Sequence, residues 1–220
     1  MTAHVSVRLR DLFLAPADGA PARRVAERVV PATVGVLGPP REGAIAAASV
    51  ALAAMRARRA RCAVVCRWDG REAVPRPGLA SPAARRLAER LERRGARAAA
   101  RGRLVTVALA GEPAEARAAA ERVHAAVQET PLVLLVAGPR PPALDPLLAM
   151  LDRLVVVTAL DAPPGLGDLA LDEAAALGHG VARFDLPDTP LGPLVASTGR
   201  PLSPSLRAAA TAALGGDRHG

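Results

Sequence analysis

The sequence predicts an α/β fold, in which a mostly parallel sheet is covered by helices on both faces as a three-layer sandwich. Two observations predict it. Short runs rich in Val and Leu alternate with longer Ala-rich segments of helical periodicity. The short runs are apolar enough to be strands buried on both faces, which is typical of parallel sheets. At 220 residues and 50% hydrophobic content, the chain can bury a full core as one domain.

Three segments are expected along the chain. Residues 1–32 begin with an alternating pattern at His4–Arg10, which predicts an edge strand, and continue as a Pro- and Ala-rich adaptor. Residues 33–214 form the α/β domain, and residues 215–220 a polar tail. The β-rich runs predict strands at Thr33–Leu37, Cys62–Arg67, Arg103–Leu109, Leu132–Ala137, Leu154–Ala159 and Gly180–Asp185. The segments between and after them predict helices at Gly43–Arg59, Pro82–Arg94, Pro113–Gln128, Leu144–Leu151, Leu169–Leu177 and Ser205–Leu214.

One connection is expected to be a loop with a functional position. The segment Asp69–Ala80 contains Pro75, Pro77 and Gly78, which interrupt helices and strands. It follows the carboxyl end of a predicted strand, where an α/β sheet normally builds its ligand site.

The charge is strongly positive and unevenly placed. The net charge is +8, and all 29 basic residues are arginine because the chain contains no lysine. Residues 1–110 carry a net charge of +13, and residues 111–220 a net charge of −5. Such a charge raises nucleic acid or an anionic membrane surface as a partner, although nonspecific nucleic-acid binding is not favoured because the high Arg content has a simpler compositional cause. Two alternatives remain open: the codon usage of a GC-rich genome, and arginines that coat solvated helix ends. Only 1% of residues are aromatic, so stacking on bases is not expected.

Cysteine and histidine usage predicts neither a disulfide nor a metal site. Cys62 and Cys66 are about 13 Å apart along one strand, too far for a disulfide, which predicts free thiols in a reducing cytoplasm. The four histidines are scattered without metal-ligand spacing. No apolar run is long enough to cross a bilayer. A cytoplasmic protein is expected, with attachment to the inner face of the membrane as an open alternative.

A glycine spacing typical of phosphate loops follows the first domain strand. The segment reads Gly38, Pro39, Pro40, Arg41, Glu42, Gly43, Ala44 and Ile45. Its spacing is that of the loop G-x-x-x-x-G-K-[ST], in which lysine and a hydroxyl contact phosphate and magnesium. Ala44 stands at the lysine position and Ile45 at the hydroxyl position. The spacing therefore predicts a P-loop NTPase-like fold that has lost the chemistry of its loop.

The order of several motifs resembles the ParA/MinD-type ATPases, and among them the divergent CpaE- and TadZ-like proteins of Flp (Tad) pilus assembly and related septum-site proteins. The resemblance covers about Thr33–Leu214. Its strongest part is the run from Pro131 to Pro142, followed by Leu144–Thr158. The late segment Phe184–Leu191 is similar to the family's loop bordering the nucleotide base, with Pro187 and Asp188 at the matching positions.

The departures from the family fall on its catalytic positions. The signature lysine after the first glycine corresponds to Pro39, and the aspartate that ends the second strand corresponds to Arg67, although Asp69 is kept. The magnesium-side aspartate corresponds to Ala137, while Pro139 remains. Lysine, magnesium and aspartate supply almost all the electrostatic stabilisation in phosphoryl transfer. The resemblance therefore implies an inactive ATPase with no catalytic residue, no metal and no required cofactor.

Three functions are compatible with this reading of the sequence. The first is a non-catalytic scaffold or localisation factor with protein partners in pilus or secretion machinery, cell-pole positioning or septum placement. A homodimer is also implied by the resemblance. The second is a module that still binds ATP, magnesium-ATP or phosphate through Arg41 and Arg67 without hydrolysis. The third is nonspecific DNA binding through the Arg-rich first half.

Overall fold

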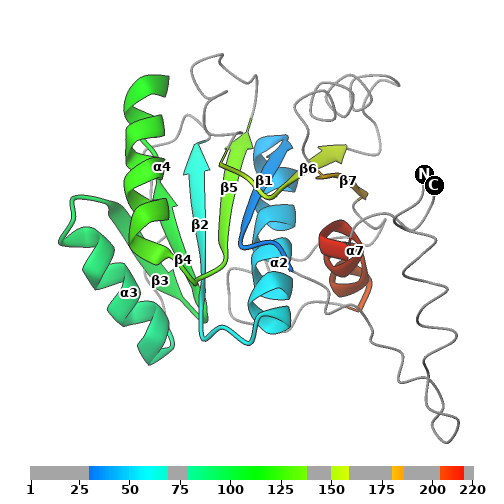
Figure 1. The fold of residues 1–220 in the computed structure, drawn as a ribbon, viewed down its shortest axis with the longest axis horizontal. Helices are drawn as coiled ribbons and strands as arrows, with labels where there is room; N and C mark the ends of the chain where they lie inside the picture. The colour runs from blue at the N-terminus through cyan, green and yellow to red at the C-terminus, as the bar shows by residue number, and fades with distance from the viewer. Residues whose placement is uncertain (1–29, 69–78, 138–149, 159–179, 186–203, 216–220) are drawn as a thin grey trace, which may run out of the picture.

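The computed structural model describes residues 30–68, 79–137, 150–158, 180–185 and 204–215. Within them a seven-stranded sheet is flanked by helices on both faces, which confirms the expected α/β three-layer fold (Figure 1). In chain order the elements are β1 (Thr33–Gly38), α2 (Pro40–Ala57), β2 (Ala63–Trp68), α3 (Pro82–Glu92), β3 (Arg97–Arg101), β4 (Leu104–Ala108), α4 (Pro113–Val127), β5 (Leu132–Ala137), β6 (Arg153–Thr158), β7 (Gly180–Asp185) and α7 (Pro204–Gly215).

The order of strands across the sheet is β3-β4-β2-β5-β1-β6-β7. Every pairing between these strands is parallel except that of β3 with β4, which is antiparallel. The crossovers from β1 to β2 and from β4 to β5 run in opposite directions across the sheet. Because parallel crossovers are right-handed, α2 and α4 must lie on opposite faces.

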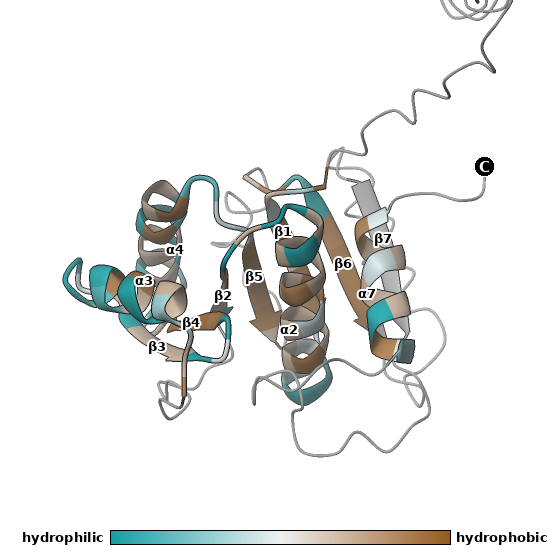
Figure 2. Cartoon of the chain, turned by 90° about the horizontal axis from the view of Figure 1, so that it is seen from below, coloured by the Kyte–Doolittle hydropathy of each residue, from teal (hydrophilic) through white to brown (hydrophobic). Residues whose placement is uncertain are grey.

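Two hydrophobic cores fill the spaces above and below the sheet. One core joins α2 and α7 to residues such as Val36, Val133 and Val155. The other joins α3 and α4 to residues such as Val64, Val105 and Leu134. Figure 2 shows the central strands coloured as hydrophobic and much of α3 as hydrophilic. The sheet is therefore the shared wall of both cores, while α3 has one buried side and one exposed side.

Small side chains allow the helices to pack closely on the sheet. Helix α2 buries twelve of its residues, and most of them are alanines. The central strand β5 is buried along its whole length. The core contains almost no aromatic residues. Its many small side chains let the helices lie close to the sheet, so the interior can still be closely packed.

Two differences from the expected elements concern the positions of strands and helix starts. The strand β3 was not expected, because its sequence Arg-Ala-Ala-Ala-Arg lacks the β-branched residues that favour strands. It forms through pairing with the whole length of β4. The helix expected at Gly43–Arg59 begins three residues earlier, at Pro40, which suits the first turn of a helix because its ring presets φ.

Several expectations fall on residues that the structure does not describe. These are the edge strand at His4–Arg10, the helix at Leu169–Leu177, residues 69–78 of the expected loop, and all but the last two residues of the helix expected at Leu144–Leu151. Met150 and Leu151 are described and are not helical. Among the described residues, no helix combines the length and hydrophobicity needed to cross a membrane.

Candidate functional site

The glycine-spaced segment forms the junction between β1 and α2, which we call the β1–α2 junction (residues 38–45). Gly38 is the last residue of β1, and Pro39 is the residue that caps α2. The six residues from Pro40 to Ile45 are helical, and the amide of Gly43 donates to the carbonyl of Pro39 at 2.7 Å. The helix was expected to begin at Gly43, and Pro40, Arg41 and Glu42 are already helical. The chain passes from strand to helix through a single residue, because Pro40 starts the helix.

Two further predicted positions, Ala137 and Arg67, lie near the carboxyl ends of their strands, as the junction does. Ala137 is paired with Gly38 at the carboxyl ends of β5 and β1. Arg67 and Trp68 are paired with Leu135 and Val136 on the other side of β5. The order β2-β5-β1 thus places these strand ends side by side. Asp69, Pro139, Pro187 and Asp188 lie outside the described residues.

Packing leaves no room for a side chain at Gly38 and little room for one at Gly43. A Cβ atom on Gly38 would lie 2.8 Å from Cβ of Val157 in β6, which is closer than two non-bonded carbon atoms normally approach. A Cβ on Gly43 would lie 3.0 Å from a terminal methyl of Leu135 and 3.4 Å from the carbonyl oxygen of Gly38. The glycine spacing that suggested a phosphate loop therefore has a structural cause in the close approach of α2 to the sheet.

The start of α2 offers few hydrogen-bond donors to an anion. A helix leaves its first four N–H groups without intrahelical partners, and these can bind phosphate. At two of those four positions, Pro39 and Pro40 have no N–H. Only the amides of Arg41 and Glu42 remain. This helix start therefore presents two free N–H groups, whereas an ordinary one presents four, because proline has no N–H.

The charges and side chains at the junction do not replace the missing lysine. The carboxylate of Glu42 lies in the first turn, where it is stabilised by the helix dipole and opposes a second anion. Arg41 is exposed, whereas Ala44 and Ile45 are 9% and 4% exposed and belong to the core between α2 and the sheet. The positions of lysine and hydroxyl in a phosphate loop are here occupied by core residues.

Asp152 is a structural residue whose contacts the sequence did not reveal. Its Oδ2 atom accepts hydrogen bonds from the amides of Ala32, at 3.0 Å, and Thr33, at 2.8 Å. Its own amide donates to the carbonyl of Thr33 at 2.9 Å. Asp152 therefore ties the first residue of β1 to the residue that precedes β6.

The two cysteines are free and buried, as predicted. Burial raises the pKa of the Cys66 thiol to about 12. Burial also raises the pKa of Cys62, although the nearby charges of Arg90 and Arg103 oppose the shift. Because the thiolate is the nucleophile and metal ligand, neither thiol is activated for chemistry near neutral pH. Among the described residues, no group of His, Cys, Asp and Glu could hold a metal ion.

A cleft of about 540 Å³ lies on the side of the sheet formed by β3 and β4. It lies between α3 and α4. It is separated from the β1–α2 junction by β2 and β5, and no junction residue lines it. Sequence reasoning did not anticipate this cleft. It depends on the strand β3 and on the spacing of two helices, neither of which has a local sequence signal.

Comparison with models of known protein families gives no match for this chain. Comparison with curated proteins gives no match either.

Proposed function

We propose that this chain is a non-catalytic ParA/MinD-like protein, a pseudo-ATPase that acts as a scaffold or localisation factor. Its partners would be proteins, for example of pilus assembly, cell-pole positioning or septum placement. The motif order described above supports the family proposal, and the α/β fold is compatible with it. The observation that carries the loss of catalysis is the helical β1–α2 junction, where Ala44 and Ile45 are core residues.

The chemistry of phosphoryl transfer explains why this junction favours a scaffold. Transfer requires cations that neutralise the developing charge on the phosphoryl group. The described junction supplies two amides and Arg41, but Glu42 opposes a further negative charge in the same turn.

The test is a sensitive phosphate-release assay with magnesium-ATP. The full chain, an Arg41→Ala variant and a mock preparation from cells without the gene are compared. We expect no release above the mock preparation for either protein. Hydrolysis by the full chain that is lost in the Arg41→Ala variant would contradict the proposal, because it would place an active site at the junction.

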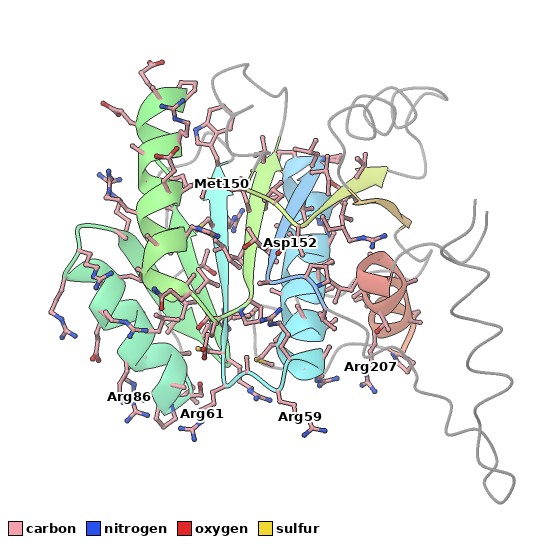
Figure 3. All side chains as sticks on the ribbon, viewed as in Figure 1. Arg59, Arg61, Arg86, Met150, Asp152 and Arg207 are labelled. Carbon is pink, nitrogen blue, oxygen red and sulfur yellow. The ribbon has the colours of Figure 1, made fainter. Side chains whose placement is uncertain are left out.

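A second candidate function, binding to a nucleic acid backbone, is favoured by one observation. Arg59, Arg61, Arg86 and Arg207 are exposed and lie along the same edge of the molecule (Figure 3). The guanidinium of Arg103 donates to the carbonyls of Ala60 and Arg61 at 3.3 Å. Arginines gathered on one edge match the phosphates of a duplex without reading bases.

Salt dependence distinguishes this candidate from the scaffold. Contacts to phosphates release counterions, so affinity for a duplex of random sequence should fall steeply between 50 and 200 mM salt, by about tenfold or more. The measurement is fluorescence anisotropy with the full chain and with the Arg59→Glu, Arg61→Glu double variant. A flat salt response, or equal affinity in the variant, would exclude binding at this edge.

A further inference from the structure

The cleft between α3 and α4 has the size and position of a ligand site. Its volume of about 540 Å³ falls in the range of clefts that bind small molecules. It adjoins Ala108 at the carboxyl end of β4 and the turn at Ala110 and Gly111 that leads into α4. The carboxyl edge of a parallel sheet is the usual location of ligands in α/β folds.

Small residues of β4, of α4 and of the connections beside them leave room for the cleft. Half of the fourteen residues that line it are Gly or Ala, including Ala118 and Ala119 on α4. The deepest part is formed by Leu91, Val107 and Val123, which are almost fully buried. The floor of the cleft is therefore aliphatic, and charged side chains line the rest of it.

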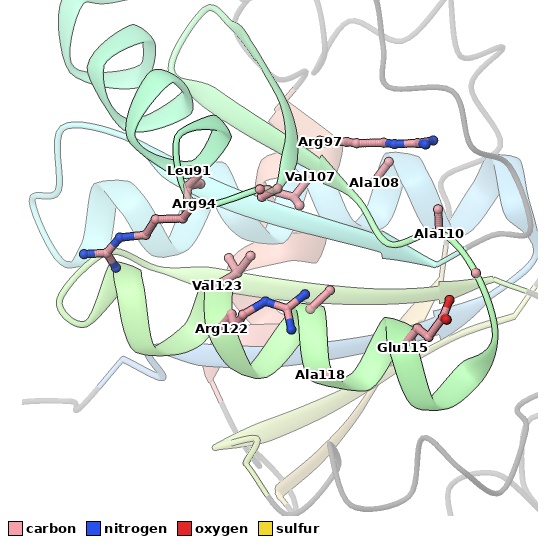
Figure 4. A pocket seen from close by; sticks show the side chains of 14 residues that line it. Leu91, Arg94, Arg97, Val107, Ala108, Ala110, Glu115, Ala118, Arg122 and Val123 are labelled. Carbon is pink, nitrogen blue, oxygen red and sulfur yellow. The ribbon is translucent and has the colours of Figure 1, made fainter.

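The charged groups at the cleft favour an anion. Arg94, Arg97 and Arg122 line it together with a single acid, Glu115. Figure 4 shows Arg122 extending from α4 along the cleft, with Arg94 at one end. The carboxylate of Glu115 lies against Gly111 at the opposite end. Arg97 already makes another interaction, and Figure 4 shows the guanidinium groups of Arg94 and Arg122 directed away from each other, so we assign the anion contact to Arg122.

The lining also limits the kind of ligand. Among the described residues that line the cleft there is no aromatic ring to stack on a base, which disfavours a nucleotide. That lining also contains no Ser, Thr, Cys or His. An aliphatic floor with exposed guanidinium groups fits a molecule that has an apolar chain and an anionic head.

We propose that this cleft binds a small amphipathic anion, with its aliphatic body on Leu91, Val107 and Val123 and its acidic head on Arg122, while Arg94 adds positive charge at one end of the cleft. Such a ligand contacts α3, the β3–β4 edge and α4 at once. Binding therefore couples the positions of the two helices on this face of the sheet. This site is independent of the β1–α2 junction and of whether the chain belongs to the proposed family.

The test is isothermal titration calorimetry of the full chain with decanoate as the probe. Acetate has the same head without the chain, and decyltrimethylammonium has the same chain with the opposite charge. Decanoate should bind saturably, acetate should give no measurable binding, and the cation should bind at least about tenfold more weakly than decanoate. Absence of saturable decanoate binding, or equal binding of the cation, would overturn the site.

Matched variants locate the binding. Arg122→Glu reverses the charge at the cleft, and Ala119→Leu fills the space with a larger side chain. Each should weaken decanoate binding by about tenfold or more, whereas Arg86→Glu, an exposed arginine of α3 outside the cleft, should leave it unchanged. If Ala119→Leu proves unstable by thermal unfolding, Arg94→Glu takes its place. Equal weakening by Arg86→Glu would show a general charge effect and contradict the assignment.

Discussion

Gly38 and Gly43 differ in how tightly an added side chain would be confined. At Gly38 the obstacle is Cβ of Val157, which belongs to the backbone-fixed part of β6 and cannot move away without shifting the strand. At Gly43 it is the end of the Leu135 side chain, which can change its position. The two glycines of the motif therefore carry different structural requirements, although the sequence shows them as an equivalent pair.

We predict that Gly38→Ala lowers the free energy of unfolding by about 1–3 kcal/mol, because the added Cβ overpacks against Val157 and displaces β6. Gly43→Ala should stay within about 1 kcal/mol of the parent, since alanine is favoured over glycine inside a helix and offsets the shift of Leu135. Urea denaturation of the two variants beside the parent measures both values. A larger loss at Gly43 than at Gly38 would contradict the packing account of the motif.

Cys66 makes the stability of the protein depend on alkaline pH. Burial raises the pKa of its thiol from about 9.0 to about 12. Between these values the unfolded chain releases the proton and the folded chain keeps it, so the contribution to stability is complete below about pH 9 and is lost as pH rises toward 12. The chain contains no lysine and no tyrosine, so few other groups titrate in this range.

We expect the free energy of unfolding to fall by at most about 1.4 kcal/mol per pH unit through Cys66 between pH 9 and 11. Replacing Cys66 by Ala should remove most of this slope, whatever it does to the stability at neutral pH. Cys62→Ala is the matched control and should remove less, because nearby arginines oppose its pKa shift. Urea denaturation at several pH values gives the slopes. An unchanged slope in Cys66→Ala would refute the assignment.

At the level of secondary-structure elements, hydrogen bonds to Asp152 connect the start of β1 to the start of β6. β1 is the strand between β5 and β6, and the carboxylate of Asp152 accepts from the amides of Ala32 and Thr33. Both amides lie at the amino end of β1, opposite the junction with α2. Asp152 therefore helps to set where β1 begins, and with it where α2 starts on the sheet.

Asp152→Ala should lower the free energy of unfolding by about 1–3 kcal/mol, because two amides at the edge of the core lose their acceptor. Asp152→Asn keeps one oxygen at the same place and should cost less. Hydrogen exchange of the amides of Ala32 and Thr33, read beside urea denaturation, reports whether β1 frays. Equal stability of the alanine variant and the parent would contradict this role.

The elements also show what local sequence can and cannot predict. The Val- and Leu-rich strands β1, β5 and β6 were predicted within one residue at each end, because a buried parallel strand requires an apolar run. The Ala-rich β3 was missed because only its pairing with β4 makes it a strand. The start of α2 was predicted at Gly43 and lies at Pro40. The glycine spacing resembles a phosphate loop, whereas proline favours the first position of a helix.

At the scale of the whole molecule, the fold class was predictable and the functional geometry was not. Alternation of strands and helices is a local property, and it predicted the three layers. The adjacency of Gly38, Ala137 and Trp68 depends on the strand order β2-β5-β1, and the cleft on the distance between α3 and α4. Both arise from long-range packing, which spacing along one sequence does not encode.

The β1–α2 junction has the sequence spacing of a phosphate loop, and we expect it not to hold a nucleotide. The most direct test is titration of the full chain with a fluorescent ATP analogue, with and without magnesium, beside an Arg41→Ala variant. We predict no saturable binding at high micromolar concentrations for either protein. Saturable binding that Arg41→Ala weakens would contradict the claim and make the junction a nucleotide site.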